Sequence, residues 1–243
     1  MRKIITTLLL CLLTLGVIAQ VSSRIKTRYG YVNQLKAYGR VLYKGLNYCP
    51  AGKDSLVVMD NGSKSDSIVI PPILTIDKKP YTVSGFKQMA FEYKQDLRYI
   101  SIPSTITEIP NSCFYHCHRL SKCVMPGVET IKGYAFLSTG FERLVFHEGL
   151  RYIGDYAFNG CSDLRYVEFP STLKKIGSGA FLQCNIDTFK VHATEPIQLE
   201  KGAVSTHAND YHHRQTVLLV PKGSKALYQA DKNWGHFTRI EEF

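Results

Sequence analysis

Three cysteines and two histidines lie close together near the middle of the chain, at Cys113, His116, Cys117, His118 and Cys123. Thiolate and imidazole are zinc ligands, and the spacing of the cysteines and His118 loosely resembles a zinc site. The chain also has six cysteines after residue 19, an even number that would suit disulfides in an exported protein. A third interpretation makes these thiols small apolar residues of a core.

A second cluster contains three histidines, His207, His212 and His213, in a polar stretch near the C-terminus. They could bind a metal, although a solvated loop is the simpler interpretation. The chain has neither a Gly-x-Ser-x-Gly nor a His-Glu-x-x-His motif, and it has no glycine-rich phosphate loop. We therefore expect no catalytic residues, no metal and no cofactor, and we expect that the protein is not an enzyme.

The three clustered cysteines lie within a sequence repeat of 22–23 residues, which determines their positions in the fold. It is marked by Ala-Phe-like pairs, whose phenylalanines are Phe91, Phe114, Phe136, Phe158 and Phe181. Five residues earlier, four of the repeats have an isoleucine, at Ile109, Ile131, Ile153 and Ile176. Three residues after the phenylalanine a cysteine recurs, at Cys117, Cys161 and Cys184. Because these cysteines occupy one position of the repeat, we favour core packing over metal binding or disulfides.

Repeats of this length with the pattern Leu-x-x-apolar-x-apolar are typical of leucine-rich repeats. One such coil cannot bury its own apolar side chains, so neighbouring coils stack and form continuous columns. We predict a leucine-rich-repeat solenoid, mostly β with short helical turns. About five coils of 22–23 residues are expected between a strand-rich N-terminal cap and a strand-helix C-terminal cap.

Residues 153–164 and 167–173 resemble the BspA-like leucine-rich-repeat family. The resemblance extends to both ends of the repeats, since residues 45–83 resemble the family's N-terminal cap and residues 218–228 with Trp234 resemble its C-terminal cap. The family comprises surface and secreted bacterial proteins. The resemblance implies a role in binding, which for some members is adhesion or host-protein binding.

The chain divides into five segments. Residues 1–19 are predicted to be a signal peptide, in which Arg2 and Lys3 precede an apolar run that ends near Ala19. The run is shorter than the roughly 20 apolar residues of a membrane span, and no later segment could cross a bilayer. Residues 20–44 form a basic N-terminal segment, 45–84 the N-terminal cap, 85–192 the leucine-rich repeats and 193–243 the C-terminal cap. The protein should be exported to the cell surface or the medium, with the periplasm as the alternative.

The formal net charge of +10 is unevenly distributed. Residues 20–53 contain seven Lys and Arg residues and no acid, whereas residues 54–243 contain 21 basic and 20 acidic residues. A basic face for nucleic acid is therefore not expected on the repeats. With so little apolar pattern, residues 20–44 are expected to be loosely attached.

The outward side chains of the predicted strands are the candidate ligand-binding site. One row contains Tyr99, Lys122, Arg143, Tyr166 and Thr188, and Arg165 lies beside it. Stacked coils would place neighbouring members of the row about 4.8 Å apart. We predict that Tyr99, Lys122, Arg143, Arg165 and Tyr166 bind an extracellular protein or glycan, and that the protein is a monomer. The alternatives are a solvated strand face and a structural or interaction role within the bacterial envelope.

Overall fold

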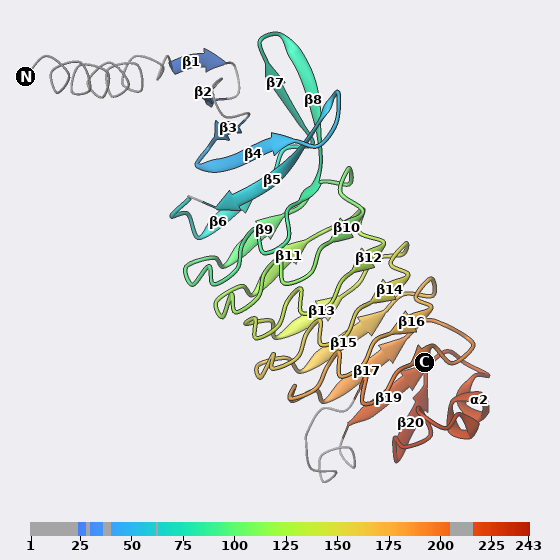
Figure 1. Ribbon diagram of the computed structural model, residues 1–243. Helices are drawn as coiled ribbons and strands as arrows, with labels where there is room; N and C mark the ends of the chain where they lie inside the picture. Colours follow the sequence, from blue (N-terminus) through green and yellow to red (C-terminus); the bar gives the residue numbers. More distant parts are fainter. Residues whose placement is uncertain (1–23, 28–29, 36–39, 62, 205–215) are drawn as a thin grey trace, which may run out of the picture.

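The computed structural model describes residues 24–27, 30–35, 40–61, 63–204 and 216–243. Its strands stack one above the next along an elongated solenoid, as Figure 1 shows. The predicted signal peptide and the histidines at positions 207, 212 and 213 lie outside the described residues. In the described part of the chain, no helix is long and apolar enough to cross a membrane.

Each of the five repeat coils contributes a longer strand to one face of the solenoid and a two-residue strand to the other, and the caps add further long strands. The first, which we call the long-strand face, contains β6 (Ser67–Val69), β9 (Tyr99–Ser101), β11 (Lys122–Val124), β13 (Arg143–Val145), β15 (Tyr166–Phe169), β17 (Thr188–Val191), β19 (Val217–Val220) and β20 (Arg239–Glu242). The second, the short-strand face, contains β10 (Glu108–Ile109), β12 (Thr130–Ile131), β14 (Tyr152–Ile153), β16 (Lys175–Ile176) and β18 (Gln198–Leu199). Neighbouring strands pair in parallel on both faces, except that β11 and β13 belong to separate sheets.

The predicted solenoid is confirmed, but it has more layers than the five coils expected. The long-strand face has three strands in one sheet and five in another, which makes eight layers. The additional layers come from segments assigned to the caps, since β6 precedes the repeats while β19 and β20 follow them. A parallel sheet can continue through any segment whose alternate residues are apolar, so the stack extends beyond the recognisable repeats.

The core consists of the predicted columns. The five repeat phenylalanines are at most 1% exposed, and their ring centroids follow one another at 5.2, 5.0, 5.2 and 5.3 Å. The isoleucines of the repeat are fully buried beside them. Each turn is also joined to the next by backbone hydrogen bonds, such as that from the N–H of Phe114 to the carbonyl of Ala135 at 2.7 Å. The stacking of coils therefore combines apolar burial with a continuous backbone ladder.

The six cysteines that the structure describes are free, and those of the repeat position are buried. Among the described residues, no group of three or more His, Cys, Asp or Glu side chains could hold a metal ion. The thiol of Cys117 lies 3.0 Å from the carbonyl oxygen of Phe91, and that of Cys184 lies 3.1 Å from the oxygen of Phe158. These cysteines therefore pack the core and donate weak hydrogen bonds to the preceding coil. Burial also raises the pKa of Cys117 to about 12.

The N-terminal cap is a seven-stranded sheet in the order β1-β2-β3-β4-β5-β8-β7. Its strands are β1 (Arg24–Thr27), β2 (Gly30–Leu35), β3 (Arg40–Tyr43), β4 (Leu46–Pro50), β5 (Ser55–Asn61), β7 (Ile73–Ile76) and β8 (Lys79–Phe86). Of residues 20–44, which are expected to be poorly ordered or loosely attached, the described parts include the strands β1, β2 and β3. They pair antiparallel from β1 to β4, and Tyr43 is buried in the core.

The C-terminal cap covers the last coils as predicted. Ser224 precedes helix α2 (Lys225–Ala230), although its side chain makes no capping hydrogen bond. Trp234 is fully buried and its indole N–H donates to the carbonyl of Ile197 at 2.8 Å. The ring of Phe237 packs edge-on against Phe189 at 5.8 Å. These contacts close the apolar end that an uncapped solenoid would expose.

Candidate functional site

Strand register brings most of the predicted row together on the long-strand face. Lys122 is paired with Tyr99, while Arg143, Tyr166 and Thr188 are consecutive in the ladder. The prediction of one continuous row is wrong at a single point, between Lys122 and Arg143. Their strands, β11 and β13, belong to separate sheets.

The first part of the row makes only a loose contact. The ammonium nitrogen of Lys122 lies 5.9 Å from the centroid of the Tyr99 ring. This distance is near the limit for a cation–π interaction at an exposed site. Both side chains can therefore reorient at little cost.

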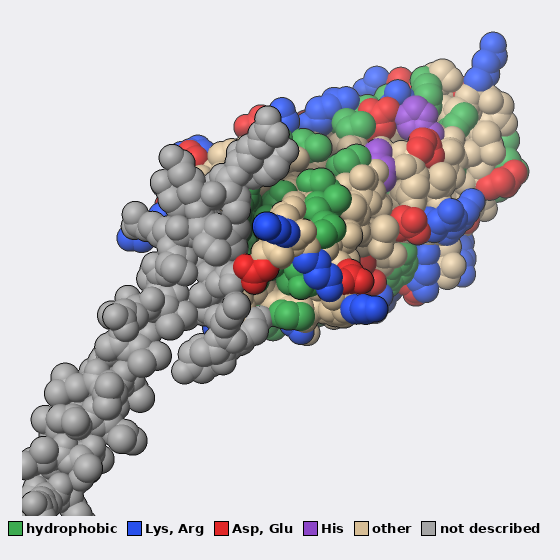
Figure 2. All heavy atoms as spheres, turned by 90° about the horizontal axis from the view of Figure 1, so that it is seen from above, with side chains coloured by type: hydrophobic (Ala, Val, Ile, Leu, Met, Phe, Trp, Pro, Cys, Tyr) green, Lys and Arg blue, Asp and Glu red, His purple; other side chains and the backbone are tan. Residues whose placement is uncertain are grey.

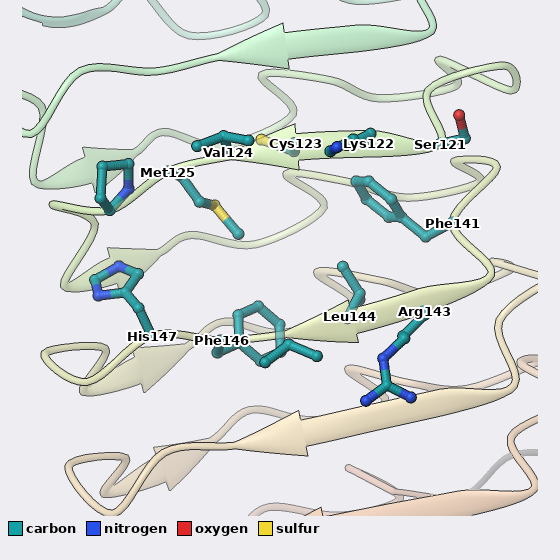
Figure 3. Close-up of a pocket in the computed structure, with 12 residues that line it drawn as sticks. Ser121, Lys122, Cys123, Val124, Met125, Phe141, Arg143, Leu144, Phe146 and His147 are labelled. Atoms are coloured by element: carbon teal, nitrogen blue, oxygen red, sulfur yellow. The ribbon is translucent and has the colours of Figure 1, made fainter.

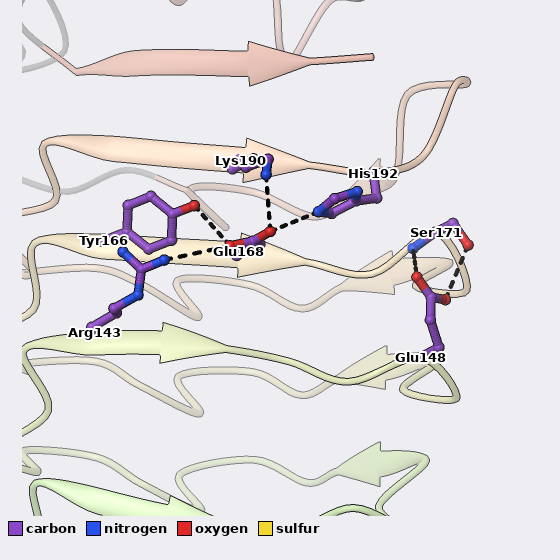
Figure 4. A network of polar contacts seen from close by, with 7 residues as sticks. All are labelled: Arg143, Glu148, Tyr166, Glu168, Ser171, Lys190 and His192. Carbon is purple, nitrogen blue, oxygen red and sulfur yellow. Dashed lines mark hydrogen bonds and ion pairs between the residues drawn. The ribbon is translucent and has the colours of Figure 1, made fainter. Parts of the chain in front are cut away.

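The second part of the row is tightly ordered. The guanidinium carbon of Arg143 lies 3.5 Å from the centroid of the Tyr166 ring, as expected for a stacked pair. The hydroxyl of Tyr166 donates to Oε2 of Glu168 at 2.7 Å, and Arg143 Nη2 lies 3.6 Å from the same oxygen. Figure 4 shows the three side chains converging above β15.

Glu168 is the centre of this network, and the sequence analysis did not identify it as a site residue. Its Oε1 lies 3.1 Å from Nζ of Lys190 and 2.7 Å from Nε2 of His192, which carries the donated proton. Burial of the carboxyl, whose side chain is 15% exposed, would raise its pKa. The hydrogen bonds from His192, Tyr166 and Lys190 outweigh that effect and lower the pKa of Glu168 to about 2. The carboxylate therefore stays charged and holds its neighbours in place.

Arg165, the remaining predicted residue, is placed differently. Its guanidinium donates to the carbonyl oxygens of Ser162 at 2.7 Å and of Asn185 at 3.3 Å. It therefore joins the turns of two adjacent coils. Part of the Arg165 guanidinium is therefore occupied, because its Nη1 already has backbone partners.

A groove of about 300 Å³ lies where the long-strand face is divided. It is lined by the segments 121–126 and 141–147. Figure 3 shows Met125, Phe141 and Leu144 pointing into the space between the two strands. One sequence signal could have revealed it: Phe141 occupies a position where the neighbouring repeats have Leu120 and Leu164.

The charges around these features are mixed. Figure 2 shows acidic and basic side chains interspersed with apolar ones over the surface in view, which is the one seen from above. On the long-strand face, Glu168 lies among Arg143, Lys190 and His192. Such a surface suits short-range polar recognition better than long-range steering.

Comparisons with known proteins agree with this architecture. The model of the BspA type leucine rich repeat region matches residues 84–202 in six copies. A leucine-rich-repeat protein of T. pallidum is 28% identical, with a TM-score of 0.55, over 61% of this chain and 70% of that chain. A comparison with curated proteins found no match.

Two more distant structures share the fold. A leucine-rich repeat protein from Bacteroides ovatus is 19% identical, with a TM-score of 0.50, over 83% of this chain and 67% of that chain. A leucine rich cell surface protein from Faecalibacterium prausnitzii is 17% identical, with a TM-score of 0.52, over 74% of this chain and 54% of that chain. These similarities extend from the repeats into the caps.

Proposed function

Residues 84–202 form a BspA-type leucine-rich-repeat region, and from this we propose that the protein is a secreted or cell-surface binding module. Proteins of this type are typically surface proteins that take part in protein interactions. Stacked repeats form an extended surface of the kind that solenoid proteins use for binding. The partner that we propose is an extracellular protein or glycan, bound on the long-strand face.

One observation supports the proposal that the partner binds on the long-strand face. Arg143 is stacked on Tyr166, and both are held by the carboxylate of Glu168. Arginine and tyrosine are enriched at the energetic centres of interfaces. Because these two are already ordered, a partner would bind them with a smaller loss of side-chain entropy.

The test begins with a binding screen of the purified protein against extracellular matrix proteins and glycans. The triple variant Tyr99→Ala, Arg143→Ala, Tyr166→Ala should fold, because surface changes usually cost little stability. It should lose binding to the ligand that the screen identifies. The matched control is Tyr152→Ala with Lys175→Ala, which changes paired residues on the short-strand face. Equal binding by the triple variant and the parent would place the contact elsewhere.

A structural or interaction role within the bacterial envelope is the second candidate. It is favoured by the extended surface that any solenoid offers to other proteins. Protease treatment of intact cells separates the two candidates. A surface binding module should be cleaved or released, whereas a protein enclosed by the envelope should be protected.

A further inference from the structure

The long-strand face has an opening between two strands of the same solenoid. Among the described residues, no backbone hydrogen bond joins segment 121–126 to segment 142–147. In the same two coils, the short-strand face is intact, because β12 pairs with both β10 and β14. Figure 3 shows the strands of Lys122 and Arg143 further apart than the strand of Arg143 and the next one.

The β11 edge of the opening can be identified from the hydrogen bonds on its other side. The N–H of Lys122 donates to the carbonyl of Arg98 at 3.1 Å, and the carbonyl of Val124 accepts from Ile102 at 2.8 Å. Alternate residues of a strand direct their backbone groups to opposite neighbours. The N–H and carbonyl of Cys123 therefore face the opening.

The β13 edge follows from the same reasoning. The carbonyl of Glu142 accepts from Arg165 at 2.9 Å, and the N–H of Phe146 donates to Glu168 at 3.0 Å, so both point towards β15. The backbone groups of Arg143 and Val145 therefore point the other way, into the opening. Two strand edges face each other there without a ladder between them.

The side chains at the opening alternate in character. Those directed inward are apolar, because Met125, Leu144 and Phe146 belong to the core. Those directed outward include two exposed valines, Val124 at 38% and Val145 at 57% exposure. An extended peptide with alternating side chains would match both sides of this surface.

Two polar groups add chemical selectivity. No carboxylate lies within ion-pair distance of Lys122 in the part of the chain that the structure describes, which leaves its charge available. His147 lines the groove, and its Nε2 is buried without a hydrogen-bond partner. Its Nδ1 is 2.6 Å from the carbonyl oxygen of Glu148 and so carries the proton, which makes Nε2 an acceptor.

We infer that this opening binds an extended segment of a partner protein, which inserts as a strand between β11 and β13. The segment runs parallel to both strands and has the pattern acidic–apolar–β-branched–apolar. Its acidic residue faces Lys122, its β-branched residue lies between Val124 and Val145, and its apolar residues pack on the core. The inference rests on the proposed binding function and names the class of partner, a polypeptide with an exposed extended segment.

The opening is bounded at one end by a close approach of two turns. A Cβ on Gly140 would collide with the carbonyl oxygen of His118, so the turns that precede β11 and β13 are in contact. The strands therefore separate while the turns beside them remain together. Because β11 and β13 are each three residues long, the insert is a short segment of about four residues.

The first test uses a synthetic peptide containing Glu-Leu-Val-Phe, flanked by serines and labelled with a fluorophore. Anisotropy should show saturable binding to the full chain. A matched peptide, N-methylated at alternate residues, keeps the side chains but loses backbone donors, and it should bind at least about tenfold more weakly. Equal binding of the two peptides, or no binding of the first, would overturn strand insertion.

Hydrogen exchange followed by NMR locates the bound peptide. The amides of Cys123, Arg143 and Val145 should exchange rapidly in the free protein and become protected when the peptide is added. The amide of Phe146 is the internal control, because it already donates to Glu168. Protection elsewhere, with these three amides unchanged, would contradict the proposed site.

A pair of variants completes the experiment. Val145→Pro removes one N–H at the opening, where proline is tolerated as it is on an edge strand. It should weaken peptide binding about tenfold, whereas Val145→Ala, which keeps the N–H, should change it far less. Val145 lies outside the row that the triple variant tests. If the peptide fails while the triple variant still loses the partner, strand insertion is wrong and the proposed function remains.

Discussion

The two strand faces of the solenoid are made by the same coils but differ in continuity. The short-strand face is one unbroken sheet from β10 to β18, whereas the long-strand face is divided between β11 and β13. The rings of Phe114 and Phe136 remain stacked at 5.0 Å in the coils that flank the division. The coils are therefore held together by the phenylalanine column and the short strands, and the long strands can separate without unstacking the solenoid.

The largest effect should come from the column itself. Phe136→Ala removes a fully buried ring from the central coil and should lower the free energy of unfolding by about 3–5 kcal/mol. Chemical denaturation measures the change. Val145→Ala, on the exposed edge of the opening, is the matched control and should stay within about 0.5 kcal/mol. Comparable losses for both would mean that the long strands carry as much stability as the column.

A smaller effect is expected from replacing Phe141, the residue that we expect to hold β11 and β13 apart. Phe141 places an aromatic ring where the adjacent coils have leucine, and it packs on Phe136 at 5.6 Å. Phe141→Leu should let β13 approach β11 and slow amide exchange at Arg143 and Val145, at a stability cost below about 1.5 kcal/mol. Leu164→Met, in the same column, should leave that exchange unchanged. Unaltered exchange in Phe141→Leu would show that the ring does not hold the strands apart.

The smallest effect concerns the polar network of the long-strand face. The pKa of Glu168 is lowered from 4.5 to about 2, so its contribution to stability is present above pH 4.5 and is lost as the pH falls towards 2. Glu168→Gln should therefore cost about 1 kcal/mol at neutral pH and little near pH 2.

Denaturation curves measured between pH 2 and 7 test the role of Glu168. Glu142→Gln, an exposed change on the same face, is the control for the loss of one carboxylate. A Glu168→Gln variant that differs from the parent equally at every pH would show that the network does not depend on the charge.

Much of the fold could be predicted from the spacing of a few residue types. The column of Phe136 and the cover provided by Trp234 followed from the repeat and from the apolar residues beyond it. The strands before residue 45 could not be predicted in this way, because they pair with other parts of the cap and not with a repeat. Glu168 was missed for a similar reason, since its hydrogen-bond and ion-pair partners Arg143, Tyr166 and Lys190 come from three different coils.

By itself, the sequence determined the columns of this protein and the direction of its outward side chains. A coil can bury its apolar residues only against an equivalent coil, so a period of 22–23 residues specifies stacking. Only the tertiary structure decided that β11 and β13 stand apart and that Glu168 forms hydrogen bonds and ion pairs with side chains of neighbouring coils. Both features depend on how side chains from several coils pack and pair, and the sequence of a single repeat does not specify that arrangement.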